Sequence, residues 1–534
     1  MADAIEGLLE EDRRFPPPDG WVSRTGVTDE GLRERAADDP EGYWAGEAGR
    51  LDWMRPFTEV LAWDAPHARW FADGTLNASA NCLDRHVAAG LGDRVAYHWE
   101  GEPGDTRTLT YADLLAEVGR TANALRALGV RRGDRVAVYL PMIPELPIVM
   151  LACARIGAAH SVVFGGFSAA ALRQRIEDAT CRVLVTADGA HRRGDTFPLK
   201  EQADLAVDGD TPVERVLVVR RTGQEVAMRD GRDVWWHDLV PTQDAACAPE
   251  EMGAEDLLFL LYTSGTTGRP KGIMHTTGGY LTQAASTHRL VFDLDPAHDV
   301  YWCAADIGWV TGHSYIVYGP LANGATSVLY EGTPNFPRED RLWSIVARYG
   351  VTQLYTAPTA IRAFMKWGRE HPDGHDLSTL RVLGSVGEPI NPEAWMWYRE
   401  VIGGGRAPVV DTWWQTETGG MMVAPIPGGT VTKPGSATFP LPGVSIDVVD
   451  EAGDPVGVPG GGYLVIDRPW PGMLRGVWGD EERFVETYWS RFPGRYFAGD
   501  GAKRDADGYL WLLGRVDDVM NVSGHRLSTT EIES

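Results

Sequence analysis

The stretch LLFLLYTSGTTGRPKGIMH, residues 257–275, is the part of the sequence that decides the fold class. A run of apolar residues, typical of a buried strand, leads directly into a loop rich in glycine, serine and threonine. Such a loop lets backbone N–H groups converge on phosphate oxygens, while its hydroxyls and its lysine add donors and positive charge. It is not a Walker A loop, because Lys271 is followed by Gly272 and not by serine or threonine. The candidate phosphate-binding residues are Thr263, Ser264, Gly265, Thr266, Thr267, Gly268 and Lys271.

Strand and helix patterns alternate on the N-terminal side of this loop. Apolar runs at 135–140, 159–164 and 182–187 have the length and composition of strands, and helical periodicity fills 145–157 and 168–178 between them. Strands that alternate with helices pair in parallel through right-handed crossovers. The sequence therefore predicts a first α/β unit here.

The same alternation returns on the C-terminal side of the loop. It gives strand patterns at 301–305, 326–330, 352–357, 381–386 and 408–414, with a helix over 340–349. Beyond residue 430 the pattern changes to short strands with glycine and proline turns, ending in a hairpin over 504–515. That change predicts a small antiparallel sheet or barrel after a second α/β unit.

Composition excludes several classes of function. Lys+Arg 50 against Asp+Glu 75 gives a net charge of −25, which repels nucleic acid and anionic membranes. The five cysteines are far apart, with no metal-ligand spacing, which fits a reducing cytoplasm. The N-terminus is acidic and lacks the features of a signal peptide, and no uninterrupted apolar stretch is long enough for a membrane span. We therefore expect a soluble, cytoplasmic protein with small-molecule partners.

Five motifs carry a resemblance to a known family. The loop TSGTTGRPKG resembles the signature of adenylate-forming enzymes, and four further motifs of that superfamily follow in its order. Two longer stretches, DIGWVTGHSYIVYGPLANGAT (306–326) and SVGEPINPEAW (385–395), resemble the acetyl-CoA synthetase branch. The four further motifs are GSVGEP (384–389), DTWWQTETG (411–419), YFAGDGAKRDADGY (496–509) and GRVDDVMNVSGHR (514–526).

The resemblance implies a fold and a reaction. The fold is a large N-terminal adenylating domain over 1–516, made of two α/β subdomains with mostly parallel sheets and a small distorted β-barrel over about 430–516. In the reaction, acetate attacks the α-phosphate of ATP to give acetyl-AMP and pyrophosphate, and coenzyme A then takes the acetyl group. The implied cofactors are ATP, Mg²⁺ and coenzyme A, since bringing an anion to a polyanion calls for cations and fixed donors.

The resemblance also implies roles for residues at the nucleotide site. Asp500 would accept the ribose hydroxyls with Arg515 beside it, although an isolated Asp-Gly is usually a plain turn. Glu417 would hold Mg²⁺, which prefers carboxylate oxygen. Lys271, Thr416 and Arg526 are the implied catalytic residues. The remaining implied nucleotide contacts are Gly387, Glu388, Pro389, Asp411, Thr412, Trp413, Trp414 and Gln415.

Acyl and coenzyme A contacts are implied in the same way. The acetate pocket corresponds to Val310, Thr311, Val386 and Trp414, with the indole of Trp414 filling the space that a longer acyl chain needs. A pocket distinguishes one methylene by only about 1–3 kcal/mol, so weak use of propionate is expected. The chain departs from some relatives at Asp195, where they carry a second arginine. The implied coenzyme A contacts are Gly165, Arg192, Arg193, Thr311, Asn335 and Ser523.

The last residues correspond to the family's hinge. Asp517 matches the residue about which a small C-terminal domain rotates, and 517–534 would be the hinge and the start of that domain. LSTTEIES (527–534) has the pattern of an N-cap and one helical turn. The family's adenylation lysine lies further on, so we expect this chain to bind nucleotide better than it completes turnover. Two alternatives remain, a synthetase for propionate or another short acid, and a non-catalytic nucleotide-binding module.

Overall fold

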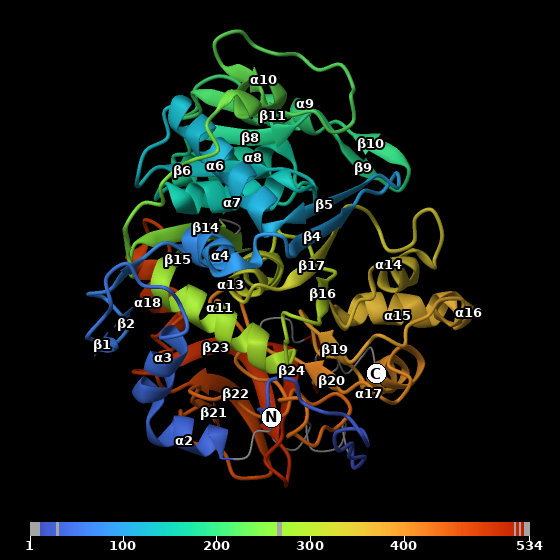
Figure 1. Ribbon diagram of the computed structural model, residues 1–534. Helices are drawn as coiled ribbons and strands as arrows, with labels where there is room; N and C mark the ends of the chain where they lie inside the picture. Colours follow the sequence, from blue (N-terminus) through green and yellow to red (C-terminus); the bar gives the residue numbers. More distant parts are fainter. Residues whose placement is uncertain (1–10, 28–30, 264–269, 517–519, 523–524, 528–534) are drawn as a thin grey trace.

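The computed structural model describes residues 11–27, 31–263 and 270–516, together with the backbone of 520–522 and 525–527. Two seven-stranded sheets dominate it (Figure 1). The first sheet has the order β12-β11-β8-β6-β7-β14-β15 and the second has the order β20-β19-β18-β16-β17-β4-β5. In both, six strands are parallel and the strand at the end of the order is antiparallel. The two α/β units expected from the sequence are therefore confirmed.

The strands of the first sheet are β6 (Arg135–Tyr139), β7 (Ala159–Val162), β8 (Val183–Ala187), β11 (Arg215–Val219), β12 (Asp233–Trp235), β14 (Leu257–Thr263) and β15 (Lys271–Thr276). Those of the second are β4 (Val95–Glu100), β5 (Thr106–Thr110), β16 (Val300–Cys303), β17 (Thr326–Tyr330), β18 (Gln353–Thr356), β19 (Val382–Ser385) and β20 (Val409–Asp411).

Helices connect and cover the two sheets. In the first unit α8 begins at an N-cap, where the Ser168 side chain accepts from the backbone of Ala171. The helices of the first unit are α6 (Tyr111–Ala127), α7 (Glu145–Arg155), α8 (Ala169–Ala179), α9 (Leu199–Ala206), α10 (Trp236–Leu239) and η2 (Val240–Thr242). Those of the second are α12 (Val310–Gly312), η3 (His313–Tyr318), α13 (Gly319–Ala322), α14 (Arg341–Tyr349), α15 (Pro358–Trp367), α16 (Glu370–Asp373), α17 (Pro392–Trp397) and η4 (Tyr398–Ile402).

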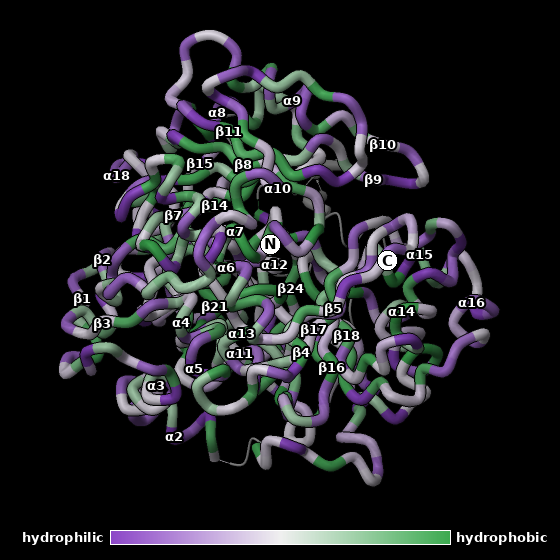
Figure 2. The backbone as a smooth tube through the Cα atoms, turned by 45° about the horizontal axis from the view of Figure 1, so that its top comes forward, coloured by the Kyte–Doolittle hydropathy of each residue, from purple (hydrophilic) through white to green (hydrophobic). Residues whose placement is uncertain are grey.

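Helix α11 (Thr277–Val291) runs through the centre of the molecule, between the first sheet and the C-terminal strands (Figure 1). All of its residues except Arg289 are buried. It follows β15 directly, so it joins the phosphate-loop hairpin to the middle of the fold. In Figure 2 the strands at the centre are largely hydrophobic, whereas peripheral elements such as α16 are hydrophilic.

The C-terminal part forms an antiparallel sheet in the order β21-β22-β23-β24. Its strands are β21 (Ile446–Val449), β22 (Gly460–Ile466), β23 (Tyr496–Arg504) and β24 (Leu510–Arg515), with α18 (Glu481–Tyr488) inserted before β23. The antiparallel sheet and the hairpin within 504–515 are confirmed. Within the described residues β21 does not pair with β24, so the sheet is open and the expected distorted barrel is not closed. Beyond it, β25 (Met520–Val522) pairs with β26 (His525–Leu527).

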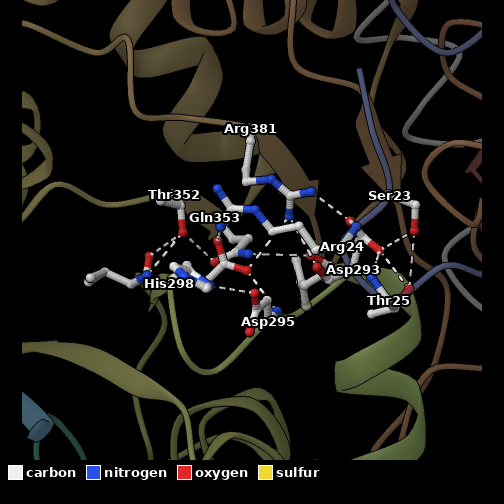
Figure 3. A network of polar contacts seen from close by, with 12 residues as sticks. Ser23, Arg24, Thr25, Asp293, Asp295, His298, Thr352, Gln353 and Arg381 are labelled. Carbon is white, nitrogen blue, oxygen red and sulfur yellow. Dashed lines mark hydrogen bonds and ion pairs between the residues drawn. The ribbon is translucent and has the colours of Figure 1, made fainter. Parts of the chain in front are cut away.

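The N-terminal residues contact all three of these parts of the chain: Phe15 pairs with Thr432, Arg24 pairs with Asp299, and Asn77 donates to the carbonyl of Ala154. Their elements are α2 (Leu32–Asp38), α3 (Pro40–Ala48), β1 (Leu61–Asp64), β2 (His67–Trp70), β3 (Thr75–Leu76), α4 (Ala78–Cys82), α5 (Asp84–His86) and η1 (Val87–Leu91), and β3 pairs with β13 (Met252–Gly253). A polar network fastens residues 23–25 to the core (Figure 3). Asp293, buried, accepts from the hydroxyls of Ser23 and Thr25 at 2.6 Å each and from Arg381 at 2.6 Å. Arg24 pairs with Asp299, which is also buried. The N-terminal segment is therefore held by buried charges as well as by apolar contacts.

No helix in the described part of the chain is long and apolar enough to cross a membrane. The five cysteines are all buried and none forms a disulfide. The boundary at residue 516 stays a prediction, because Asp517 and residues 528–534 lie outside the described residues.

Candidate functional site

A cavity of about 370 Å³ lies where β19 and β20 end, facing β23 and β24. Its position follows a general rule of parallel α/β sheets, in which ligands bind beyond the carboxyl ends of the strands. It brings together four of the sequence motifs described above. The lining residues are Gly387, Glu388, Pro389, Asp411, Thr412, Trp413, Trp414, Gln415, Glu417, Ala437, Asp500, Leu512, Gly514 and Arg515.

Asp500 forms one corner of the cavity. Its Oδ2 accepts from the indole N–H of Trp413 at 3.1 Å and from the amide of Gln415 at 2.7 Å, which fixes the carboxyl group. Arg515 lies opposite on β24, with its Nη1 4.0 Å from Oδ1. Gly499 permits this approach, because a Cβ there would lie 2.7 Å from the Arg515 guanidinium. Burial raises the pKa of Asp500 to about 6, an increase that Arg515 limits.

The strand ends of the second sheet form the opposite wall. Asp411 is 5% exposed and its Oδ1 has no hydrogen-bond partner among the described residues. Burial raises its pKa to about 8, which favours the neutral form of this carboxyl group near pH 7. Gly387 has a φ of 99°, and a Cβ there would meet no atom within 4 Å. The sequence placed Glu388 at the nucleotide, but its carboxylate accepts from the backbone of Thr359 at 2.6 Å, at the first turn of α15. Its side chain is thus engaged with that helix.

Lys271 and Glu417 meet at the other end of the site through a tyrosine that the motifs did not identify. The ammonium of Lys271 donates to the hydroxyl of Tyr488 at 2.7 Å, and that hydroxyl donates to Glu417 Oε1 at 2.6 Å. The Lys271 and Glu417 side chains are also 3.6 Å apart. Burial lowers the pKa of Lys271, and the charge of Glu417 opposes that change. The phosphate-loop lysine and the candidate metal carboxylate are therefore adjacent.

The loop that carries Thr416 and Glu417 is held by four donors from three separate segments. The carbonyl of Thr416 accepts from His275 Nε2 at 2.7 Å, and that of Glu417 from the backbone of Leu474 at 2.9 Å. Carbonyls 418 and 419 accept from Trp470 and Ser314, at 2.9 and 2.8 Å. A carbonyl only accepts, so Nε2 of His275 carries the proton. Burial lowers the pKa of His275 to about 3 and keeps the ring neutral.

The residues expected to form the acetate pocket lie around Trp414. Its indole N–H donates to the hydroxyl of Tyr355 at 3.1 Å, and its ring meets Tyr315 edge-on with centroids 4.9 Å apart. Val310 and Val386 are 8% and 5% exposed and belong to the apolar cluster against which Trp414 packs. Thr311 follows Val310 in α12. Trp414 itself lines the cavity, so it stands between the cavity and the core.

Some of the expected coenzyme A contacts meet at a second place. Arg192 ends β9 (Ala190–Arg192) and faces Asp195 of β10 (Asp195–Phe197) across a hairpin whose turn is Arg193 and Gly194. Both turn residues have positive φ, and a Cβ on Gly194 would touch the ring of Phe336, next to Asn335. Gly165 follows Phe164, whose backbone lies against Gly308 near Thr311. The hairpin and Asn335 thus come together.

Several expected residues lie outside the described part of the chain. They are Ser264, Gly265, Thr266, Thr267 and Gly268 of the phosphate loop, Asp517 and Ser523, and the side chain of Arg526. The two ends of the loop are described. Thr263 pairs with Lys271 across the β14–β15 hairpin, and both side chains are largely buried.

Comparison with known proteins identifies the family to which the chain belongs. A family model described as AMP-binding enzyme matches residues 84–478, and one described as acetyl-coenzyme A synthetase N-terminus matches residues 30–82. The chain is 64% identical over 533 residues to a protein named acetyl-coenzyme A synthetase from Streptomyces avermitilis, covering 100% of this chain and 82% of that protein. It is 62% identical over 523 residues to one from Rubrobacter xylanophilus, covering 98% and 81%. It is also 62% identical over 541 residues to one from Mycobacterium tuberculosis, covering 99% and 83%.

Proposed function

The chain belongs to the acetyl-coenzyme A synthetase family of AMP-binding enzymes, and on that premise we propose how its residues serve an ATP-dependent acetate–CoA ligase. The activity joins acetate to ATP to form acetyl-AMP and pyrophosphate. Transfer of the acetyl group to the thiol of coenzyme A then gives acetyl-CoA and AMP. Each step brings groups together that repel or react slowly in water, so the work of the protein is to position and neutralise them.

ATP occupies the 370 Å³ cavity, with its ribose on Asp500 and its phosphates toward Lys271. The observation that carries this assignment is the state of the Asp500 carboxyl group. Two N–H donors hold one oxygen, and the other faces Arg515 beside the cavity. A carboxylate fixed in this way accepts hydrogen bonds from the ribose hydroxyls without further ordering. Burial favours the neutral form of Asp411, which limits the negative charge that would repel the phosphates.

The residues at the phosphate end fit Mg²⁺ brought in with the triphosphate. Glu417 offers one partly buried carboxylate beside Lys271, and the positive charge of the ammonium supports the assignment of this end to polyanions. Within the described residues no group of three or more candidate ligands is present, which fits an ion held by one carboxylate, phosphate oxygens and water. Bound Mg²⁺ would neutralise phosphate charge. Lys271 would contact the phosphates, and the pinned loop would place Glu417 and Thr416.

Acetate lies against Trp414, Val310, Thr311 and Val386. The ring of Trp414 is held by Tyr355 and Tyr315, so it is a rigid wall that leaves room for a short acyl group.

Coenzyme A enters past the β9–β10 hairpin, where Arg192 and Arg193 face its 3′-phosphate and Asn335 lies alongside. Gly165, Thr311 and Ser523 complete the proposed coenzyme A contacts. The five free, buried cysteines support a reducing, cytoplasmic setting.

Alkyl esters of AMP test the acyl part of this proposal, because they mimic the acyl-adenylate without reacting. By calorimetry, the protein should bind the ethyl ester at least about tenfold more tightly than the butyl ester. Trp414→Gly should reverse that ratio, because it opens the space behind the indole. Comparing the two esters within each protein cancels any general loss of affinity. An unchanged ratio in Trp414→Gly would refute the proposed pocket.

A further inference from the structure

Tyr488 lies at a junction between two groups of the proposed phosphate and metal end. It is the last residue of α18, it is 4% exposed, and its ring stacks on that of Tyr496 with centroids 5.4 Å apart and planes at 13°. Phe484 lies one turn earlier on the same buried face of α18, and the centroids of its ring and the Tyr488 ring are 6.2 Å apart. The packing of α18 on β23 therefore fixes the position of the Tyr488 ring before any ligand binds.

The hydroxyl of Tyr488 is used in both directions. It accepts from the ammonium of Lys271 and donates to Glu417, so one oxygen joins groups from β15 and from the 411–419 motif. The ammonium also lies 4.8 Å from the centroid of the Tyr488 ring, within the range of a cation–π contact. Tyrosine can do this because its hydroxyl is both a donor and an acceptor.

We propose that Tyr488 is a positioning residue for the triphosphate end, holding Lys271 and Glu417 in place while leaving both exchangeable for phosphate and metal. The inference rests on the proposed function of these two residues. Lys271 and Glu417 already form an ion pair, with Nζ 3.6 Å from Oε1. Without the hydroxyl, the two charges can close to direct hydrogen-bond contact at low solvent exposure, where opposite charges attract strongly. A ligand would then have to break that pair before using either group. With the hydroxyl bound to both, the ammonium and the carboxylate stay 3.6 Å apart, and a ligand displaces this longer, weaker contact.

The consequence is specific for the part of the nucleotide beyond the α-phosphate. ATP with Mg²⁺ reaches Lys271 and Glu417, whereas AMP ends before them. Replacing Tyr488 by phenylalanine keeps the ring and its contacts with Tyr496 but removes the hydroxyl. We expect Tyr488→Phe to lower the ratio of Mg·ATP affinity to AMP affinity by about tenfold, the usual effect of one hydrogen bond to a charged group.

The experiment is calorimetric titration of the full chain with AMP, with ATP plus Mg²⁺, and with ATP plus a chelator. Tyr111→Phe is the matched control, since Tyr111 is a fully buried tyrosine whose hydroxyl donates to the Ala325 carbonyl far from the site. It should lower the melting temperature without altering the ratio. A double variant with Lys271→Met should show little additional effect of Tyr488→Phe, because the two residues act through one contact.

Each outcome decides the proposal. An unchanged ratio in Tyr488→Phe, or an equal loss for AMP and ATP, would overturn it in favour of a purely structural tyrosine. Absence of nucleotide binding by the unaltered protein would instead refute the proposed function. If Tyr488→Phe does not fold, Tyr488→4-aminophenylalanine provides the test, because its amino group places a donor and a lone pair at the position of the hydroxyl. That variant should keep a ratio within about threefold of the unaltered protein, and a tenfold fall would contradict the proposal.

Discussion

The two large sheets have the same strand order but use it differently. In each, five parallel strands can be numbered along the chain from one to five. Their order across the sheet is then fifth, fourth, third, first and second. Each is extended beside its second strand by a two-stranded hairpin. The hairpins are exchanged along the chain: β4–β5 precedes the first unit but joins the second sheet, and β14–β15 precedes the strands of the second unit but joins the first sheet. The exchange places the phosphate-loop hairpin of the first sheet beside the strand ends of the second.

Two buried aspartates at strand ends make the difference concrete. Asp188 follows β8 in the first sheet, and its carboxylate accepts from the backbone of residues 189, 221, 222 and 223. Asp411 ends β20 in the second sheet, and its Oδ1 has no partner within the described residues. In the first sheet the carboxylate accepts hydrogen bonds from backbone N–H groups and so stabilises the fold. In the second sheet the strand ends border the proposed nucleotide cavity. Of two similar sheets, one therefore uses its strand-end aspartate for stability and the other presents it to the proposed binding site.

The largest expected effect is on stability, in the first sheet. Asp188→Ala leaves four backbone N–H groups, one buried and three part-buried, without their acceptor, and we expect the free energy of unfolding to fall by about 4 kcal/mol. Urea titration measures the fall, and adenosine titration of the folded variant should give an unaltered dissociation constant. A variant that keeps normal stability but loses adenosine affinity would place nucleotide binding in the first sheet and contradict this account.

The next effect is on binding, at the corner of the cavity that β23 supplies. Asp500→Ala removes the proposed ribose acceptor, so adenosine affinity should fall by about 3 kcal/mol, more than a hundredfold. Asp188→Ala is its counterpart, with the opposite pattern of stability and affinity. In the unaltered protein, adenosine binding should also weaken as pH falls through about 6, because protonated Asp500 no longer accepts from both hydroxyls. Adenosine has no phosphate to titrate, and pH-independent binding from 5 to 8 would contradict this role.

A smaller effect concerns Asp411 and pH. Its folded-state pKa of about 8 lies above its ordinary value of 3.8. Its contribution to stability is therefore complete below the unfolded pKa and is lost as pH rises toward 8. Asp411→Asn stays neutral throughout, so its stability relative to the unaltered protein should rise by about 2 kcal/mol from pH 5 to pH 6.5. Urea midpoints at the two pH values measure this, and a relative stability that falls with pH would show a paired, ionised Asp411.

The smallest effect is expected at the edge of the first unit. Arg192→Ala should weaken coenzyme A binding by about 1 kcal/mol, since an exposed charge contact is screened by solvent. Dephospho-coenzyme A is the matched ligand, because it lacks the 3′-phosphate. Its affinity should be the same for both proteins. An equal loss for the two ligands would remove Arg192 from phosphate recognition.

Much of this arrangement follows from local sequence. Alternating apolar runs predicted both parallel sheets, because period and length are local properties of the chain. The motifs placed Lys271, Asp411, Trp414 and Asp500 around one region, and the structure brings the last three to one cavity.

Other features depend on long-range packing and left no local signal. Which sheet each hairpin joins is decided by pairing across the fold, as is the open edge between β21 and β24. Tyr488 and His275 have no motif of their own, and their roles arise from contacts with residues 217 and 141 positions away. Glu388 matched a nucleotide motif, yet its carboxylate is engaged by the first turn of α15.

Photolabelling with 8-azidoadenosine tests the central claim most directly, because it reports where the adenine lies. Peptide mass spectrometry of the labelled protein should find the adduct within 385–389 or 411–415, at the carboxyl ends of β19 and β20. Competition by AMP should remove it. An AMP-protected adduct within 140–142, 163–166 or 187–190, at the ends of β6, β7 and β8, would contradict the account and move the nucleotide to the first sheet.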